Sequence, residues 1–156
     1  MTKRSAGIAL YRMQGSEPAL LLVHPGGPFW KGKDEGAWSI PKGLYSEEED
    51  ALEAAQREFC EETGSSPRGP FATLGDFRLP GGKVLSVWAA EGDFDPTALQ
   101  SNTFTIDWPP GSGQKATFAE VDHACWFSAA DALKKVTKGQ QQVVERLLTY
   151  LKERQG

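Results

Sequence analysis

Apolar runs and turn-forming residues alternate along the first quarter of the chain. Residues 5–13 and 18–24 are rich in apolar and β-branched side chains, and Gln-Gly-Ser-Glu between them is typical of a turn. Residues 25–36 contain two prolines and four glycines, which favours a loop. The pattern therefore predicts two strands joined by a turn and followed by a loop.

The pattern becomes helical over residues 48–63, where apolar positions recur every three or four residues. Ser46 is predicted to cap this helix, with Glu49 as the second member of a capping box. Gly64 stands where the glycine after a helix belongs. The apolar stripe would seat the helix on a sheet, and its members are Ala51, Leu52, Ala55 and Phe59.

The remaining segments are mostly short strands. They are predicted at residues 37–40, 71–77, 83–90, 103–108 and 124–127. Ser128 is predicted to cap a helix, and residues 139–154 form a final amphipathic helix. Along the sequence, strands precede and follow the central helix, and no regular βαβ repeat is visible. This order predicts a mixed α/β (α+β) sandwich in one domain, residues 1–156.

Composition narrows the classes of function. Net charge is −4, the pI is about 5.2, and hydrophobic residues make up 39% of the 156. A negative surface disfavours long nucleic acids, whereas a small phosphorylated substrate remains compatible. No apolar run approaches the roughly 18 residues that span a bilayer, and no signal peptide is evident, so we expect a cytoplasmic protein. Cys60 and Cys125 show neither metal-ligand nor disulfide spacing.

Three glutamates of the predicted helix carry the candidate chemistry. Glu58 and Glu62 lie one turn apart, and Glu61 lies beside them. Three carboxylates on one flank repel one another, and Mg²⁺ or Mn²⁺ would offset that repulsion. A solvated acidic helix face is the alternative explanation.

The spacing resembles the Nudix box, G-x5-E-x7-R-E-U-x-E-E-x-G-U, where U is a bulky apolar residue. The matching residues are Gly43, Glu49, Arg57, Glu58, Phe59, Glu61, Glu62 and Gly64. Ser65 departs from the final apolar position. The Trp-Ser-Ile-Pro-Lys-Gly segment before the box, and Glu120 ahead of Cys-Trp-Phe, also resemble Nudix domains.

This resemblance implies a Nudix-type α/β/α sandwich with a mixed central sheet. It also implies a hydrolase in which water attacks phosphorus with the help of Mg²⁺ or Mn²⁺. By resemblance, Glu58, Glu61 and Glu62 are the metal ligands, and the backbone at Gly43 permits close approach of metal or phosphate.

The resemblance also suggests roles around the metal ligands. Arg57 resembles the arginine that pairs with the first glutamate of the box, here Glu49. Glu61 and Glu120 are both candidates for the general base. Glu120 is alternatively an additional metal ligand or an exposed loop residue.

Evidence on the substrate is indirect. Pro-Lys-Gly at the entry to the box resembles Nudix members that act on polyphosphates, and Lys42 is a candidate phosphate contact or a solvated lysine. Trp30 in the glycine-rich loop is a candidate for stacking on a base. His24 is a candidate substrate contact or a structural histidine.

These residues favour a small nucleotide substrate, with a dinucleoside polyphosphate such as diadenosine tetraphosphate ahead of a nucleoside triphosphate. ADP-ribose or another nucleotide sugar is a further alternative, followed by a Nudix-like binding domain without activity. The oligomeric state is left open.

Overall fold

A six-stranded mixed sheet forms the centre of the computed structural model, which describes residues 3–155. Its strands are β1 (Arg4–Gln14), β2 (Glu17–Pro25), β3 (Lys42–Leu44), β4 (Ala72–Arg78), β5 (Val84–Glu91) and β8 (Val121–Ser128). The strand order is β4-β5-β1-β2-β8, and β3 pairs with β1. Only β1 and β5 pair in parallel; the other pairs are antiparallel. The predicted mixed sheet is therefore confirmed.

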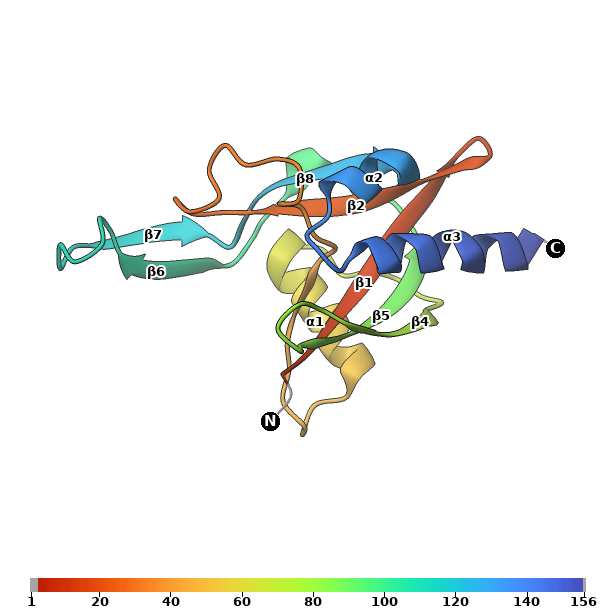
Figure 1. Cartoon of the computed structure of the whole chain (residues 1–156), viewed down its shortest axis with the longest axis horizontal. Coiled ribbons are helices and arrows are strands. Elements are labelled where there is room, and N and C mark those ends of the chain that lie inside the picture. The colour runs from red at the N-terminus through yellow and green to blue at the C-terminus, as the bar shows by residue number, and fades with distance from the viewer. Residues whose placement is uncertain (1–2, 156) are drawn as a thin grey trace.

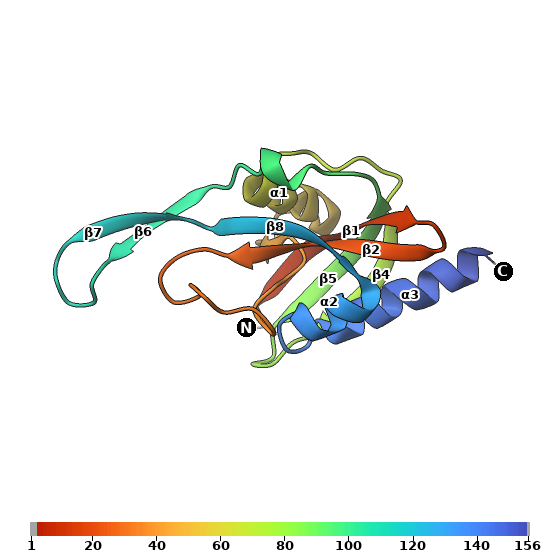
Figure 2. The ribbon, with the colours of Figure 1, turned by 90° about the horizontal axis from the view of Figure 1, so that it is seen from above.

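Helices cover both faces of this sheet. α1 (Ala51–Thr63) lies on one face, and α2 (Ala129–Lys135) and α3 (Gln141–Gln155) lie on the other (Figures 1 and 2). Successive strand residues point to opposite faces. Leu21 accordingly packs with Phe59 of α1, whereas Leu20 and Leu22 pack with the helices of the second face. This arrangement is the predicted α/β/α sandwich.

A two-stranded hairpin extends away from the sheet (Figure 1). It consists of β6 (Thr103–Asp107) and β7 (Lys115–Ala119), preceded by a 3-10 helix, η1 (Pro96–Ala98). β7 leads almost directly into β8, so the base of the hairpin lies beside the end of β2. The predicted strand at 103–108 is thus present, but its partner β7 was missed.

Two further local predictions were wrong. The helix begins at Ala51 rather than at residue 48, because Asp50, not Ser46, caps it by accepting a hydrogen bond from the Glu53 backbone N–H. Residues 37–40 form no strand and make only single bridges, from Ser39 to Val23 and from Trp38 to Val136. The short strand follows instead at β3.

The ends of α1 and α2 otherwise agree with the sequence. Gly64 follows α1 with φ of 82°, in the left-handed region that favours glycine, and Ser128 caps α2. No helix among residues 3–155 is long and apolar enough to cross a membrane.

Candidate active site

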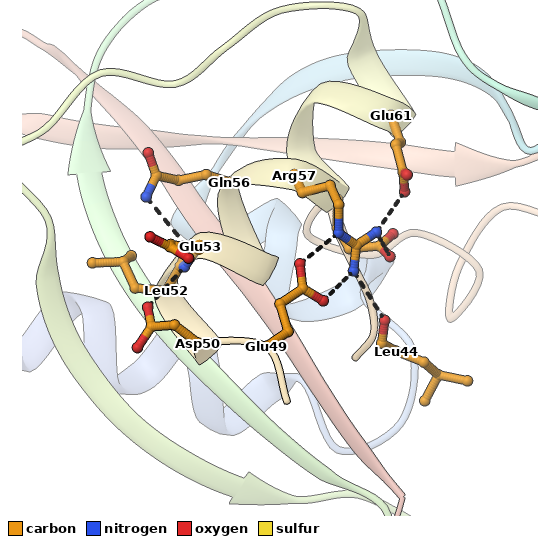
Figure 3. Close-up of polar contacts among 9 residues, drawn as sticks. Leu44, Glu49, Asp50, Leu52, Glu53, Gln56, Arg57 and Glu61 are labelled. Carbon is orange, nitrogen blue, oxygen red and sulfur yellow. Dashed lines mark hydrogen bonds and ion pairs between the residues drawn. The ribbon is translucent and has the colours of Figure 1, made fainter. Parts of the chain in front are cut away.

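Arg57 lies at the centre of a carboxylate cluster on α1 (Figure 3). Its Nε and Nη2 donate to the two oxygens of Glu49, at 2.7 and 2.9 Å, and its Nη1 donates to Glu58 at 2.8 Å and Glu61 at 3.0 Å. A planar guanidinium suits this two-pronged contact. The contact holds the pKa of Glu49 below its usual range, and Glu49 in turn raises the pKa of Arg57. Arg57 therefore connects the segment before the helix to the helix face.

Gly43 allows the Glu58 carboxylate to lie directly against β3. A Cβ at Gly43 would come within 2.0 Å of Glu58 Oε2. The Glu58 side chain is only 13% exposed, and burial raises the pKa of its carboxyl despite the hydrogen bond from Arg57. The predicted glycine thus stands where a side chain of the helix packs against the backbone of β3.

Glu62 is the most perturbed carboxylate of the site. Burial, opposed by Lys42 and reinforced by the negative charges of Glu58 and Glu120, raises the pKa of Glu62 to about 8. Its Oε1 accepts a hydrogen bond from the Lys42 backbone N–H at 3.2 Å. Glu62 is therefore a partly buried carboxylate whose negative charge is incompletely balanced.

A cavity of about 280 Å³ adjoins this carboxylate, and we call it the metal-side cavity. Its walls include Trp30, Lys42, Glu62 and Glu120. Glu120 is exposed, and Trp30 is 37% exposed. The structure therefore brings four of the residues singled out in the sequence around one space, from the loop, the box entry, α1 and the junction between β7 and β8.

His24 lies outside this cavity. It is buried, its Nε2 donates to the Lys33 carbonyl at 2.6 Å, and its Nδ1 lies 2.9 Å from Asp122 Oδ1. Both ring nitrogens thus contact protein atoms. These two contacts connect the end of β2 to the glycine-rich loop and to β8. His24 lines a second cavity on the hairpin side.

The donor set fits a hard divalent cation. In the described part of the chain no three acidic, histidine or cysteine side chains already surround a point that could hold an ion. Glu58 and Glu61 face Arg57 as they stand, so holding an ion requires their carboxylates to turn. The partly buried Glu62 beside Glu58 and Glu120 is nevertheless the kind of uncompensated oxygen cluster that Mg²⁺ neutralises.

Sequence reasoning missed the aromatic residues of the hairpin. Trp108 and Phe118 line the second cavity, facing the glycine-rich loop. The signal was present, because Trp-Pro-Pro-Gly-Ser-Gly is flanked by two segments with alternating apolar residues. The high proline and glycine content of residues 93–113 concealed it.

Comparison with known structures supports the fold over nearly the whole chain. A Caenorhabditis elegans Ap4A hydrolase in a binary complex shares 20% identity with a TM-score of 0.67, covering 97% of this chain and 99% of that one. The NUDIX domain of Shewanella oneidensis NrtR, complexed with ADP ribose, shares 21% with a TM-score of 0.65, covering 97% and 89%. A mutT/nudix family protein from Listeria innocua shares 20% with a TM-score of 0.65, covering 97% and 95%.

Comparison with protein families gives a match to the NUDIX domain over residues 1–147. That range includes the Arg57 cluster, the box entry and Glu120. With Glu49, Glu58 and Glu61 gathered around Arg57, and with helices on both faces of the mixed sheet, the chain belongs to the Nudix family.

Proposed function

We propose that this protein is a metal-dependent pyrophosphohydrolase that cleaves a phosphoanhydride bond in a nucleoside diphosphate-linked substrate. The observation that carries the proposal is the partly buried Glu62, with Glu58, Glu120 and Lys42 around it at the edge of a cavity. Membership of the Nudix family supports the same reaction class.

In this proposal Glu58, Glu61 and Glu62 hold Mg²⁺ or Mn²⁺, together with the backbone at Gly43. A bound ion would lower the pKa of the attacking water and neutralise charge on the phosphate oxygens. Arg57 holds Glu58 and Glu61 on the same flank of α1, from which their carboxylates would turn toward the ion, and it keeps Glu49 in place. Lys42 lies beside Glu62, where its ammonium group would contact a phosphate.

Glu120 is the better placed of the two candidate bases. It is exposed and lines the metal-side cavity, whereas the Glu61 carboxylate is paired with Arg57. If Glu120 takes the proton from water, Glu120→Gln lowers kcat and removes the acidic limb of the pH profile of kcat/KM. Loss of that limb in Glu61→Gln, with Glu120→Gln retaining it, would assign the base to Glu61 instead.

The proposed substrate is a dinucleoside polyphosphate such as diadenosine tetraphosphate. Trp30 on the wall of the metal-side cavity offers an aromatic surface to a nucleoside, and Lys42 a charge to the polyphosphate chain. Among solved structures of similar fold, one is an Ap4A hydrolase and another holds ADP ribose. A nucleoside triphosphate would fit the same metals and the same Lys42, so it remains the second candidate.

A turnover screen with Mg²⁺ tests both the proposed reaction class and the proposed substrate. The substrates are diadenosine polyphosphates, nucleoside triphosphates, ADP-ribose and NADH, with products separated by chromatography. We expect the highest kcat/KM for diadenosine tetraphosphate, and a lower ratio of that value to the value for ATP in Trp30→Ala. A ratio of one or less in the wild type, or an unchanged ratio in Trp30→Ala, would favour a triphosphate pyrophosphohydrolase. Failure to turn over any of these substrates would contradict the reaction class.

A further inference from the structure

A second and larger cavity lies between the β6–β7 hairpin and the glycine-rich loop. Its volume is about 950 Å³, and we call it the hairpin cavity. Trp108 and Phe118 come from the hairpin side, and Lys31 and Lys33 come from the loop. Trp38 and Asp122 also line this cavity.

The two cavities open on opposite faces of β2. Val23 and Pro25 line the metal-side cavity, whereas His24 between them lines the hairpin cavity. Alternate side chains of a strand point to opposite faces, so β2 and the loop after it separate the two spaces. The loop contributes Trp30 to one cavity and Lys31 and Lys33 to the other.

Contacts between loop and hairpin fix the shape of this cavity. The backbone N–H of Gly26 donates to the Glu120 carbonyl at 2.9 Å, and a Cβ at Gly26 would meet the Ala119 carbonyl oxygen at 2.0 Å. A Cβ at Gly27 would meet the Phe104 ring at 2.8 Å. The two consecutive glycines therefore let the loop lie directly on the hairpin.

The aromatic walls are held by contacts of their own. Trp108 packs edge-on against Phe29 with ring centroids 5.5 Å apart. The Trp38 indole N–H donates to Asp34 at 2.9 Å, and its ring lies edge-on to His24 at 5.1 Å. Rings fixed in this way lose little conformational freedom when a flat ligand stacks on them.

The polar groups of the cavity complement a nucleotide. Asp122 Oδ1 is occupied by His24 and by His123, at 2.9 and 3.1 Å, and the contacts found among residues 3–155 leave Oδ2 to accept a further hydrogen bond. Lys31 and Lys33 are exposed cations on the loop. Flat aromatic walls, an acceptor for an amino group and nearby positive charge together match an amino-bearing base that carries a phosphate.

We propose that the hairpin cavity binds the second nucleoside of the substrate, an amino-bearing purine that stacks on Trp108 and Phe118 and donates to Asp122. This inference rests on the proposed function, because it places one nucleoside on each side of the loop with the phosphates at the glutamates. Lys31 and Lys33 would then accompany the polyphosphate chain around the loop.

Direct binding of AMP to the metal-free protein tests this site apart from catalysis. Calorimetry is done in chelator, where the unneutralised glutamates repel a phosphate and binding therefore reports on the other cavity. We expect AMP to bind the wild type. Trp108→Leu and Phe118→Leu should each weaken AMP binding roughly 5- to 100-fold, the range for loss of one stacking ring.

Two controls sharpen the result. Thr105→Ala changes an exposed hairpin residue outside the cavity wall and should leave AMP binding unchanged. Purine riboside monophosphate, which lacks the amino group of AMP, should bind the wild type more weakly than AMP does, and Asp122→Ala should abolish that difference. Circular dichroism establishes that each variant is folded.

The inference is overturned if metal-free wild type does not bind AMP, or if folded Trp108→Leu and Phe118→Leu both bind it as the wild type does. It is equally overturned if purine riboside monophosphate binds as tightly as AMP. Its failure is distinguishable from failure of the proposed function. Turnover without AMP binding removes only the hairpin site. AMP binding without Mg²⁺-dependent turnover removes the hydrolase, and the hairpin cavity is then a nucleotide site without a role in hydrolysis.

Discussion

At the scale of single residues, the site depends on how closely one helix can approach one strand. Gly43 has no side chain, so the Glu58 carboxylate occupies the space where a Cβ would stand. Arg57 then holds Glu49, Glu58 and Glu61 in one hydrogen-bonded group. Residues of one motif thus provide both the close packing of Glu58 on β3 and the positive charge that pairs with the three glutamates.

Gly43→Ala should therefore displace Glu58 and disrupt the site. A Cβ 2.0 Å from a carboxylate oxygen cannot be accommodated without movement, and Glu58 is the neighbour that has to move. We expect a fall in kcat of tenfold or more and weaker Mg²⁺ dependence, measured by turnover against metal concentration. Leu44→Ala, at the adjacent exposed position, is the matched control and should retain activity. Wild-type kinetics in Gly43→Ala would show that this close approach is unnecessary.

Much of this residue-level arrangement could be predicted from spacing. One helical turn separates Glu58 from Glu62, so their proximity follows from a correct helix assignment. Side-chain partners could not be predicted in the same way. The resemblance to Nudix domains indicated a role for Glu120, but the partial burial of Glu62 beside it could not be predicted, because Glu120 is distant along the chain and reaches the site through the pairing of β8 with β2.

At the scale of elements, the start of α1 shows where local sequence rules stop being decisive. Ser46 and Asp50 are both good N-cap residues, and Ser46 with Glu49 matches a capping box. In the fold the Glu49 carboxylate is bound to Arg57, and the helix begins after Asp50. The Glu49 carboxylate is thus engaged by Arg57, eight residues further along the chain, and Asp50 is the residue that caps the helix.

Helix capping predicts effects of different size on stability for substitutions of Asp50 and Ser46. Asp50→Ala should lower the free energy of unfolding by about 1 kcal/mol, the usual value of an N-cap, because the Glu53 N–H loses its acceptor. Ser46→Ala should change it by much less. Urea unfolding followed by circular dichroism measures both. A larger effect for Ser46→Ala than for Asp50→Ala would restore the cap predicted from the sequence.

The hairpin illustrates the other limit of sequence analysis. β6 was predicted, but β7 (Lys115–Ala119) has only β6 as a partner and follows a turn rich in proline and glycine. By contrast, β1, β2 and β5 lie at the centre of the sheet, where continuous burial gives long apolar runs. Elements buried in the sheet were therefore predicted within a few residues, and the exposed element was not.

At the scale of the whole molecule, the site stores unfavourable charge that a metal ion would relieve. The pKa of Glu62 is about 8 in the folded protein and near 4.5 in the unfolded chain. The folded state therefore holds more protons than the unfolded state between these pH values, and stability falls as pH rises through that interval. Burial shifts the pKa of Glu58 in the same direction.

Thermal unfolding in chelator should show this dependence. We expect the contribution of Glu62 to be fully present below about pH 4.5 and lost above about pH 8, with a slope of at most about 1.4 kcal/mol per pH unit. Glu62→Gln carries no charge and should flatten the decline, and Mg²⁺ should raise the melting temperature of the wild type most at pH 8. Parallel curves for wild type and Glu62→Gln would mean that Glu62 titrates normally.

The central claim is that the glutamates of α1 carry metal-dependent hydrolysis, and one comparison tests it most directly. Turnover of the best substrate at saturating Mg²⁺ is measured for wild type, Glu58→Gln and Glu53→Gln. Glu53 lies on the same helix, is exposed and stands outside the Arg57 cluster. Glu53→Gln therefore makes the same Glu-to-Gln change at a position outside the proposed site. We predict a loss of about 10²-fold or more in kcat for Glu58→Gln and near wild-type turnover for Glu53→Gln. Near-normal turnover by Glu58→Gln would contradict the account.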